Sequence, residues 1–112
     1  MGWELYPESI YHLLKEWSKC GKPIYITENG LADAKDSQRA WFIAEVVKNI
    51  NRAREEEVDV RGYFYWSLLD NFEWAHGFGP RFGLIEVDFK TYERRFKPSA
   101  RHLAQIIQRQ KV

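Results

Sequence analysis

The sequence has little cysteine, and Cys20 is its single thiol among 112 residues. One cysteine cannot form an intramolecular disulfide, and no Cys/His cluster indicates a metal site. Residues 1–4 lack the basic and apolar regions of a signal peptide, and no apolar run approaches the length of a membrane span. These absences predict a reduced, cytoplasmic environment and a protein without a bound metal or cofactor.

Excess charge is also lacking, because the net charge is only +1. Both signs are spread along the chain, so there is no basic patch for nucleic acid or an anionic membrane. We therefore expect neither as a partner. Aromatic residues are abundant instead: five Trp, six Tyr and seven Phe exceed the need of a plain core. Several fall in predicted loops, where they must pack on something or hold a ligand.

The most informative stretch covers residues 23–30, an apolar, β-branched run that ends in a carboxylate, an amide and a glycine. Strand formers without polar alternation predict a parallel strand buried on both faces. Asn29 and Gly30 are turn residues, so we expect the strand to end at Glu28. A carboxylate at this end of a strand is a catalytic position in α/β folds. The alternative is a solvated residue at the start of a loop.

Three helices are predicted around this strand. The first follows Pro7 and carries an apolar stripe at i, i+3, i+4 and i+7, made of Ile10, Leu13, Leu14 and Trp17. Asp36 or Ser37 can cap the second helix, which ends in a solvated acidic run at residues 55–57. Its stripe is Ile43, Val46, Val47, Ile50 and Ala53. The last helix begins near Pro98 and buries Ala100, Leu103, Ile106 and Ile107.

Residues 58–69 form a second predicted strand, again with little polar alternation. A long loop follows over residues 70–81, and loops of this length inside compact domains are usually functional. Residues 82–89 are expected to add a short extended piece before a turn at residues 90–91.

This order of elements is typical of repeated βα units, whose right-handed crossovers make the two strands parallel. Two parallel strands with apolar faces need further strands, and 112 residues are less than half of the ~250 of a (β/α)8 barrel. We therefore predict an α/β fold: a single piece over residues 1–112 that forms the last two βα units of an incomplete barrel. Glu28 and residues 66–82 then lie at its functional rim.

Three motifs occur in order along the chain: Tyr-Ile-Thr-Glu-Asn-Gly at residues 25–30, Arg-Gly-Tyr-Phe-Tyr-Trp-Ser-Leu-Leu-Asp-Asn-Phe-Glu-Trp at residues 61–74, and Arg-Phe-Gly-Leu at residues 81–84. Together they resemble family-1 glycoside hydrolases, which are retaining β-glycosidases on a (β/α)8 barrel. The resemblance runs over nearly the whole chain, and residues 31–33 are similar to the archaeal branch.

The resemblance implies roles for particular residues. Glu28 matches the nucleophile, which attacks the anomeric carbon and forms a covalent glycosyl-enzyme. Trp66 matches the aromatic platform under the sugar. Glu73 matches the carboxylate that accepts hydrogen bonds from sugar hydroxyls remote from the anomeric centre, and Trp74 matches the neighbouring indole donor.

Two further aromatics complete the implied site. Phe82 matches a pocket-wall residue, and Trp3 matches an aromatic on the aglycone side. Pyranose C–H groups stack on indole rings, which agrees with these roles, but large aromatics also dominate ordinary cores. Barrel core is therefore the alternative for Trp66 and Phe82. His76 is a loop histidine with no assigned role.

One essential group is missing from the sequence. A retaining glycosidase needs two carboxyl groups about 5 to 5.5 Å apart, a nucleophile and an acid/base. In this family the acid/base lies in an Asn-Glu-Pro motif on an earlier strand, and that tripeptide is absent from the 112 residues. Glu73 is no substitute, because its motif match is to a sugar ligand and the leaving group would still lack a donor. We expect the isolated chain to be inactive.

Two other functions stay open. The chain can be a non-catalytic carbohydrate-binding module that uses Trp66, Glu73 and Trp74, or a half-barrel block that self-associates through its unpaired strand edges. The nucleophile motif favours the glycosidase, because a binder has no use for Glu28. The first expected partner is a β-glycoside, and the sequence leaves both glucose and galactose open as its sugar. The second is either the missing N-terminal part of the barrel or further copies of the chain.

Overall fold

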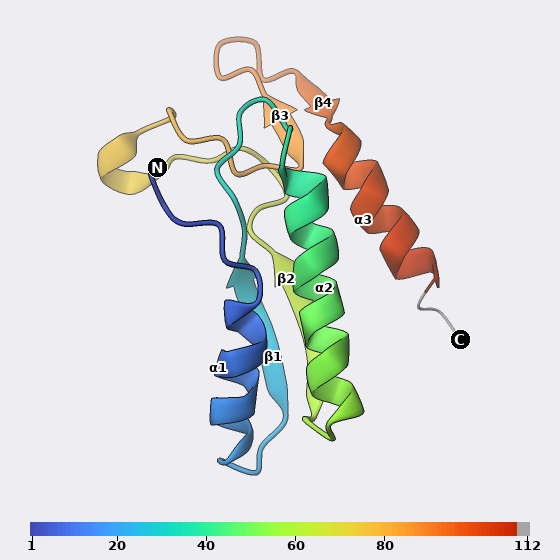
Figure 1. The fold of residues 1–112 in the computed structure, drawn as a ribbon. Coiled ribbons are helices and arrows are strands. Elements are labelled where there is room, and N and C mark those ends of the chain that lie inside the picture. Colours follow the sequence, from blue (N-terminus) through green and yellow to red (C-terminus); the bar gives the residue numbers. More distant parts are fainter. Residues whose placement is uncertain (110–112) are drawn as a thin grey trace.

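The computed structural model describes residues 1–109, which form an α/β arrangement of helices and two small sheets (Figure 1). The elements in chain order are α1 (Ser9–Ser18), β1 (Ile24–Asn29), α2 (Arg39–Glu55), β2 (Val60–Tyr65), the short 3-10 helix η1 (Trp74–His76), β3 (Ile85–Val87), β4 (Arg94–Phe96) and α3 (Pro98–Arg109). None of the helices within residues 1–109 is long and apolar enough to cross a membrane.

The strands β1 and β2 pair in parallel, with α2 as the crossover, as predicted. The pairing runs from Ile24 opposite Val60 to Asn29 opposite Tyr65. β1 thus includes Asn29 and does not end at Glu28, and β2 is shorter than the predicted 58–69. The N–H of Trp66 still bonds to Asn29, but from Ser67 onward the backbone groups bond to the segment around residues 82–85, so the chain leaves the sheet there.

Helices cover one face of this sheet. The hydrophobic core lies between the sheet and the helices α1 and α2, and includes Ile10, Leu14, Ile26, Val46 and Val60. On the other face, Tyr25 is 55% exposed and Phe64 is 60% exposed. The prediction of strands buried on both faces is therefore wrong for this chain, because no element within residues 1–109 packs on the second face.

The helix α1 shows only half of its predicted stripe. Ile10 and Leu14 are buried, but Leu13 is 53% exposed and Trp17 is 62% exposed. The helix contacts α2 and β1, and these contacts leave the flanking apolar positions uncovered. It begins at Ser9, two residues after Pro7. In α2 the predicted stripe is confirmed at Ile43, Val46, Ile50 and Ala53, whereas Val47 is half-buried.

The start of α2 differs from the prediction. Neither Asp36 nor Ser37 caps it, and the residue at the N-cap position is Gln38. The carboxylate of Asp33 accepts hydrogen bonds from the backbone N–H groups of Gln38 (2.8 Å) and Arg39 (3.2 Å) instead. A capping oxygen is supplied from five residues upstream, beyond the local spacing that a sequence pattern examines.

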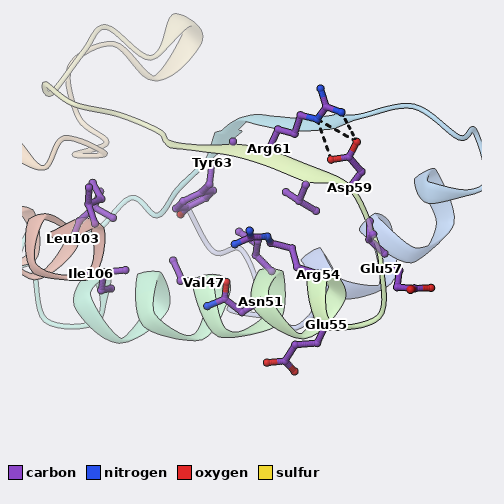
Figure 2. Close-up of a pocket in the computed structure, with 15 residues that line it drawn as sticks. Val47, Asn51, Arg54, Glu55, Glu57, Asp59, Arg61, Tyr63, Leu103 and Ile106 are labelled. Atoms are coloured by element: carbon purple, nitrogen blue, oxygen red, sulfur yellow. Dashed lines mark hydrogen bonds and ion pairs between the residues drawn. The ribbon is translucent and has the colours of Figure 1, made fainter. Parts of the chain in front are cut away.

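The helix α3 begins at Pro98 as predicted, but its apolar side is not buried. Ser99 is its buried residue, and Ile107 is 52% exposed. The predicted core positions Ala100, Leu103 and Ile106 are half-buried. α3 packs on α2, and a groove of about 930 Å³ separates its apolar side from β2 (Figure 2).

The predicted extended piece is β3, and it forms an antiparallel hairpin with β4. Ile85 pairs with Phe96 and Val87 pairs with Arg94. β4 was not predicted, since its three residues are exposed and show no apolar alternation. The hairpin leads directly into α3.

Candidate active site

The site begins where the ends of β1 and β2 meet. The backbone N–H of Trp66 donates a hydrogen bond to the carbonyl of Asn29 at 2.9 Å. A Cβ on Gly30 would lie 1.6 Å from the carbonyl oxygen of Trp66, so only glycine allows this approach. Glu28 and Trp66 are therefore held at the same end of the sheet by main-chain contacts.

The side chain of Glu28 is exposed at this end of β1. Its carboxylate takes part in none of the ion pairs formed within residues 1–109. The neighbouring Asn29 is fixed, because the Tyr63 hydroxyl donates to its Oδ1 at 3.1 Å. A free carboxylate on a fixed strand end is available to an incoming molecule.

Two tyrosine hydroxyls bond to the end of β1 and the loop after it: Tyr63 to Asn29 and Tyr65 to Leu31. Burial raises the pKa of Tyr63, and the nearby Tyr65 raises it further. Burial also raises the pKa of Tyr65, although hydrogen bonding with Leu31 and the charge of Arg39 act in the opposite direction. Both phenols are therefore neutral hydrogen-bonding groups in the folded protein at ordinary pH.

The side chain of Arg39 is fully buried beneath the loop that follows β1. Its guanidinium pairs with Asp36 and donates to the Tyr65 hydroxyl at 3.0 Å. It also donates to the backbone carbonyls of Asp33 (2.6 Å) and Arg81 (2.7 Å). Arg39 thus ties the loop after β1 to the loop after β2.

The same cluster lowers the pKa of the capping carboxylate, Asp33. Burial alone would raise the pKa of Asp33, but the N–H groups of Gln38 and Arg39 and the Arg39 charge hold it below its ordinary value. Asp36 completes the link to α3, since its carboxylate accepts from the backbone N–H (2.9 Å) and hydroxyl (2.6 Å) of Ser99.

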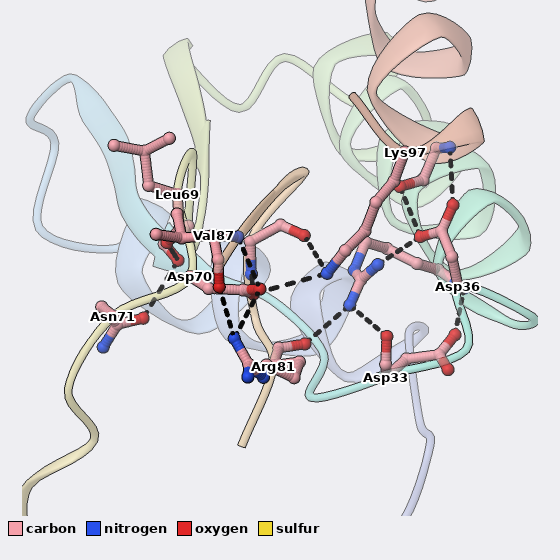
Figure 3. A network of polar contacts seen from close by, with 12 residues as sticks. Asp33, Asp36, Leu69, Asp70, Asn71, Arg81, Val87 and Lys97 are labelled. Carbon is pink, nitrogen blue, oxygen red and sulfur yellow. Dashed lines mark hydrogen bonds and ion pairs between the residues drawn. The ribbon is translucent and has the colours of Figure 1, made fainter. Parts of the chain in front are cut away.

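A second buried carboxylate, Asp70, fixes both ends of the long loop (Figure 3). It accepts hydrogen bonds from the N–H groups of Gly83 (2.9 Å) and Val87 (3.3 Å). It also pairs with Arg81 at 3.3 Å and with Lys97 at 3.4 Å. Burial and the Arg39 charge lower the pKa of Lys97, while Asp70 partly offsets them.

The two sugar-ligand candidates lie on this loop. Glu73 is half-buried, and its Oε2 accepts a hydrogen bond from Asn71 Nδ2 at 2.9 Å. Trp74 follows in η1 and is 82% exposed, with a positive φ of 45°. Glu73 is oriented by its neighbours, whereas the indole of Trp74 projects into solvent.

The two remaining candidate aromatics, Trp3 and Phe82, form a tilted pair. Phe82 is 2% exposed, and its ring centroid lies 5.9 Å from that of Trp3, which is 59% exposed. The carbonyl of Phe82 accepts from the N–H of Ser67 at 3.3 Å, which connects the pair to the end of β2. Trp3 covers Phe82, so Trp3 presents the open aromatic face of the two.

The structure thus joins Glu28 to Trp66 by the sheet, Trp66 to Phe82 and Trp3 through Ser67, and leaves Trp74 outside these contacts. The groove of Figure 2 is separate, since it is lined from the beginning of β2. Sequence reasoning missed Arg39, Asp70 and Asn71. Helical spacing could have indicated Arg39: it precedes Ile43 by four residues, which places it on the buried face of α2.

Comparisons with known proteins agree on one family. The model of Glycosyl hydrolase family 1 matches residues 1–112. The chain is 49% identical to the β-galactosidase of Sulfolobus acidocaldarius, over 88% of this chain and 20% of that protein. It is 53% identical to the β-galactosidase of Pyrococcus woesei, over 84% of this chain and 18% of that protein.

A solved structure shows the same likeness. The hyperthermophilic β-glucosidase from Pyrococcus furiosus superimposes with a TM-score of 0.95 at 46% identity, over 99% of this chain and 24% of that one. The chain therefore spans about a fifth of the length of the curated relatives it matches.

Proposed function

Since this chain belongs to glycosyl hydrolase family 1 and is a partial α/β piece of that family's (β/α)8 barrel, we propose that it is the C-terminal portion of a retaining β-glycosidase. The proposed reaction is hydrolysis of terminal β-linked sugars of the glucoside or galactoside type. The observation that carries the proposal is the exposed carboxylate of Glu28 at the end of β1, held beside Trp66 by the main chain.

In the proposed mechanism, a carboxylate oxygen of Glu28 forms a bond to the anomeric carbon as the glycosidic C–O bond breaks. The leaving oxygen takes a proton from an acid/base that this chain lacks. Water then cleaves the glycosyl-enzyme ester and regenerates the carboxylate. A strand end held by main-chain bonds suits this role, because a nucleophile must be held near its productive position.

The sugar is proposed to stack on Trp66, with Trp3 toward the aglycone and Phe82 behind it. The ionised carboxylate of Glu73 accepts hydrogen bonds from hydroxyls remote from the anomeric carbon, and Trp74 donates from its indole. Charge-assisted hydrogen bonds of this kind are stronger than neutral ones, so they select between sugars.

The partner that completes this site is proposed to be the N-terminal part of the barrel, which brings the acid/base. The exposed sheet face with Tyr25 and Phe64 supports this, because these rings need a cover. Without that part the chain is expected to be inactive. A cytoplasmic location belongs to the same proposal and rests on the single thiol, Cys20, which is exposed.

The test is hydrolysis of an aryl β-glycoside by the purified chain, alone and mixed with the remaining part of such a barrel. We expect activity only in the mixture, lost in Glu28→Gln and retained in the matched control Glu86→Gln, which changes an exposed residue of β3. Activity of the chain alone would contradict the proposal and make Glu73 the first candidate acid. An inactive mixture would contradict it as well.

Self-association is the second candidate function, favoured by the same exposed sheet face. Copies of the chain could pair their free strand edges and cover Tyr25 and Phe64. A stable oligomer that does not yield to the N-terminal part of the barrel would favour this alternative. A monomer that binds sugar without hydrolysis in the mixture would instead indicate a carbohydrate-binding module.

A further inference from the structure

The side chain of Asn71 connects the end of β2 to Glu73. Ser67 Oγ lies 3.2 Å from Asn71 Oδ1, and Asn71 Nδ2 lies 2.9 Å from Glu73 Oε2. The amide orientation follows from chemistry, since an ionised carboxylate only accepts hydrogen bonds and the Nδ2 group must face it. Asn71 Oδ1 then faces Ser67, whose hydroxyl proton is shared with the carbonyl of Leu69 at 2.7 Å.

Ser67, from which Asn71 is held, is itself fixed in place. Ser67 is 8% exposed, its N–H donates to the carbonyl of Phe82, and its carbonyl accepts from the N–H of Leu84 at 2.9 Å. Asp70 lies immediately before Asn71, and its side chain is wholly buried among its four partners (Figure 3). The chain of contacts from Ser67 through Asn71 to Glu73 therefore starts from a segment that is held by backbone bonds and by the buried Asp70.

Glu73 has less support of its own. No regular element spans the segment between β2 and η1, and the backbone N–H of Glu73 bonds only to the carbonyl of Gly77, at 2.7 Å. The bond from Asn71 engages Oε2 and leaves Oε1 to accept from another donor. One carboxylate oxygen is thus used to orient the other.

We propose that Asn71 is a positioning residue that orients the Glu73 carboxylate toward the sugar hydroxyls remote from the anomeric carbon. The inference rests on the proposed function, and deepens it by naming what orients Glu73 in the site. Ser67 is the anchor from which Asn71 acts.

The first experiment compares Asn71→Ala with wild type in the mixture of this chain and the rest of the barrel. For an aryl β-glucoside we expect KM to rise on the order of tenfold, as for the loss of a hydrogen bond to a charged group. The kcat value should stay within about twofold. In the Glu73→Gln background, adding Asn71→Ala should change KM for the same glucoside by less than about twofold, because Asn71 acts only through the Glu73 carboxylate.

The matched control is Asn51→Ala, which removes an amide from the groove of Figure 2, away from Glu28. It should leave KM and kcat unchanged. An equal rise in KM from Asn71→Ala with and without Glu73→Gln would overturn the inference, because it would indicate damage to the fold or an effect that does not pass through Glu73. A fall in kcat with unchanged KM would overturn it too.

A second measurement does not depend on activity. In the 15N-labelled chain, the side-chain amide resonances of Asn71 should shift when Glu73→Gln removes the carboxylate charge, while those of Asn51 should not. An Asn71 amide whose resonances do not respond to this change overturns the inference. An inactive wild-type mixture contradicts the proposed function instead, and the amide comparison still decides whether Asn71 contacts Glu73.

Discussion

At the residue scale, the approach of β1 to β2 depends on Gly30. In Gly30→Ala the new Cβ would meet the Trp66 carbonyl oxygen at 1.6 Å, and a backbone atom cannot move aside cheaply. We expect a loss of about 3 kcal/mol or more in the free energy of unfolding, measured by urea denaturation. The control Gly79→Ala, whose nearest atom lies at 3.4 Å, should cost much less. Equal losses would contradict the close approach.

Tyr63 makes stability depend on alkaline pH. Burial raises its pKa in the folded state, so the unfolded chain loses the phenolic proton first as the pH rises. The folded state then holds more protons than the unfolded one, and stability falls above about pH 10. Unfolding measured from about pH 8 to about pH 12 should show this fall. It should weaken in Tyr63→Phe and persist in Tyr92→Phe, which alters an exposed ring.

At the scale of elements, Asp70 in the loop after β2 contacts Val87 of β3 and Lys97, the residue before α3. Asp70→Asn keeps the shape but removes the charge that faces Lys97, whose side chain is 8% exposed. Breaking a buried pair costs about 3 to 5 kcal/mol, because one charge remains unpaired. We expect a loss of that order on urea unfolding, partly recovered by adding Lys97→Met. Glu93→Gln, in the exposed pair with Arg95, should have little effect.

Elements with a strong local pattern could be predicted from the sequence. Ile43, Val46, Ile50 and Ala53 repeat along α2, and the structure confirms both the helix and its buried face. The exposed Trp17 could not be predicted in the same way, because its spacing matches Ile10 but no neighbouring element reaches it. Local spacing identifies a helix, and tertiary contacts decide how much of its apolar side is covered.

In the candidate site, too, some residues could be predicted from the sequence and others could not. Glu28 is the second-last residue of β1 and Trp66 directly follows β2, and the parallel pairing of the two apolar strands brings these ends together. The roles of the predicted site residues remain predictions. Asp70 and Arg39 escaped sequence reasoning, because their partners lie up to 42 residues away and no local pattern marks a buried charge.

At the scale of the whole molecule, the uncovered sheet face predicts association. Tyr25 and Phe64 offer a contiguous apolar surface, since a Cβ on the intervening Gly62 would lie 2.7 Å from the Tyr25 ring and 3.4 Å from that of Phe64. Sedimentation velocity of the chain alone should show a mass that rises with concentration. Phe64→Lys should reduce this association, whereas Phe96→Lys on β4 should not. A monomer at every concentration would contradict the prediction.

The main-chain bond between Asn29 and Trp66 and the close approach of Gly30 also bear on how such a site can change over time. The positions of Glu28 and Trp66 depend on a backbone contact and one glycine, and not on the side chains that meet a ligand. The residues proposed to face a ligand can therefore be exchanged without rebuilding the frame that carries Glu28, the proposed nucleophile. Under the proposed function, substitutions at Glu73 or Trp74 would change the choice of substrate while the Glu28 carboxylate stays in place.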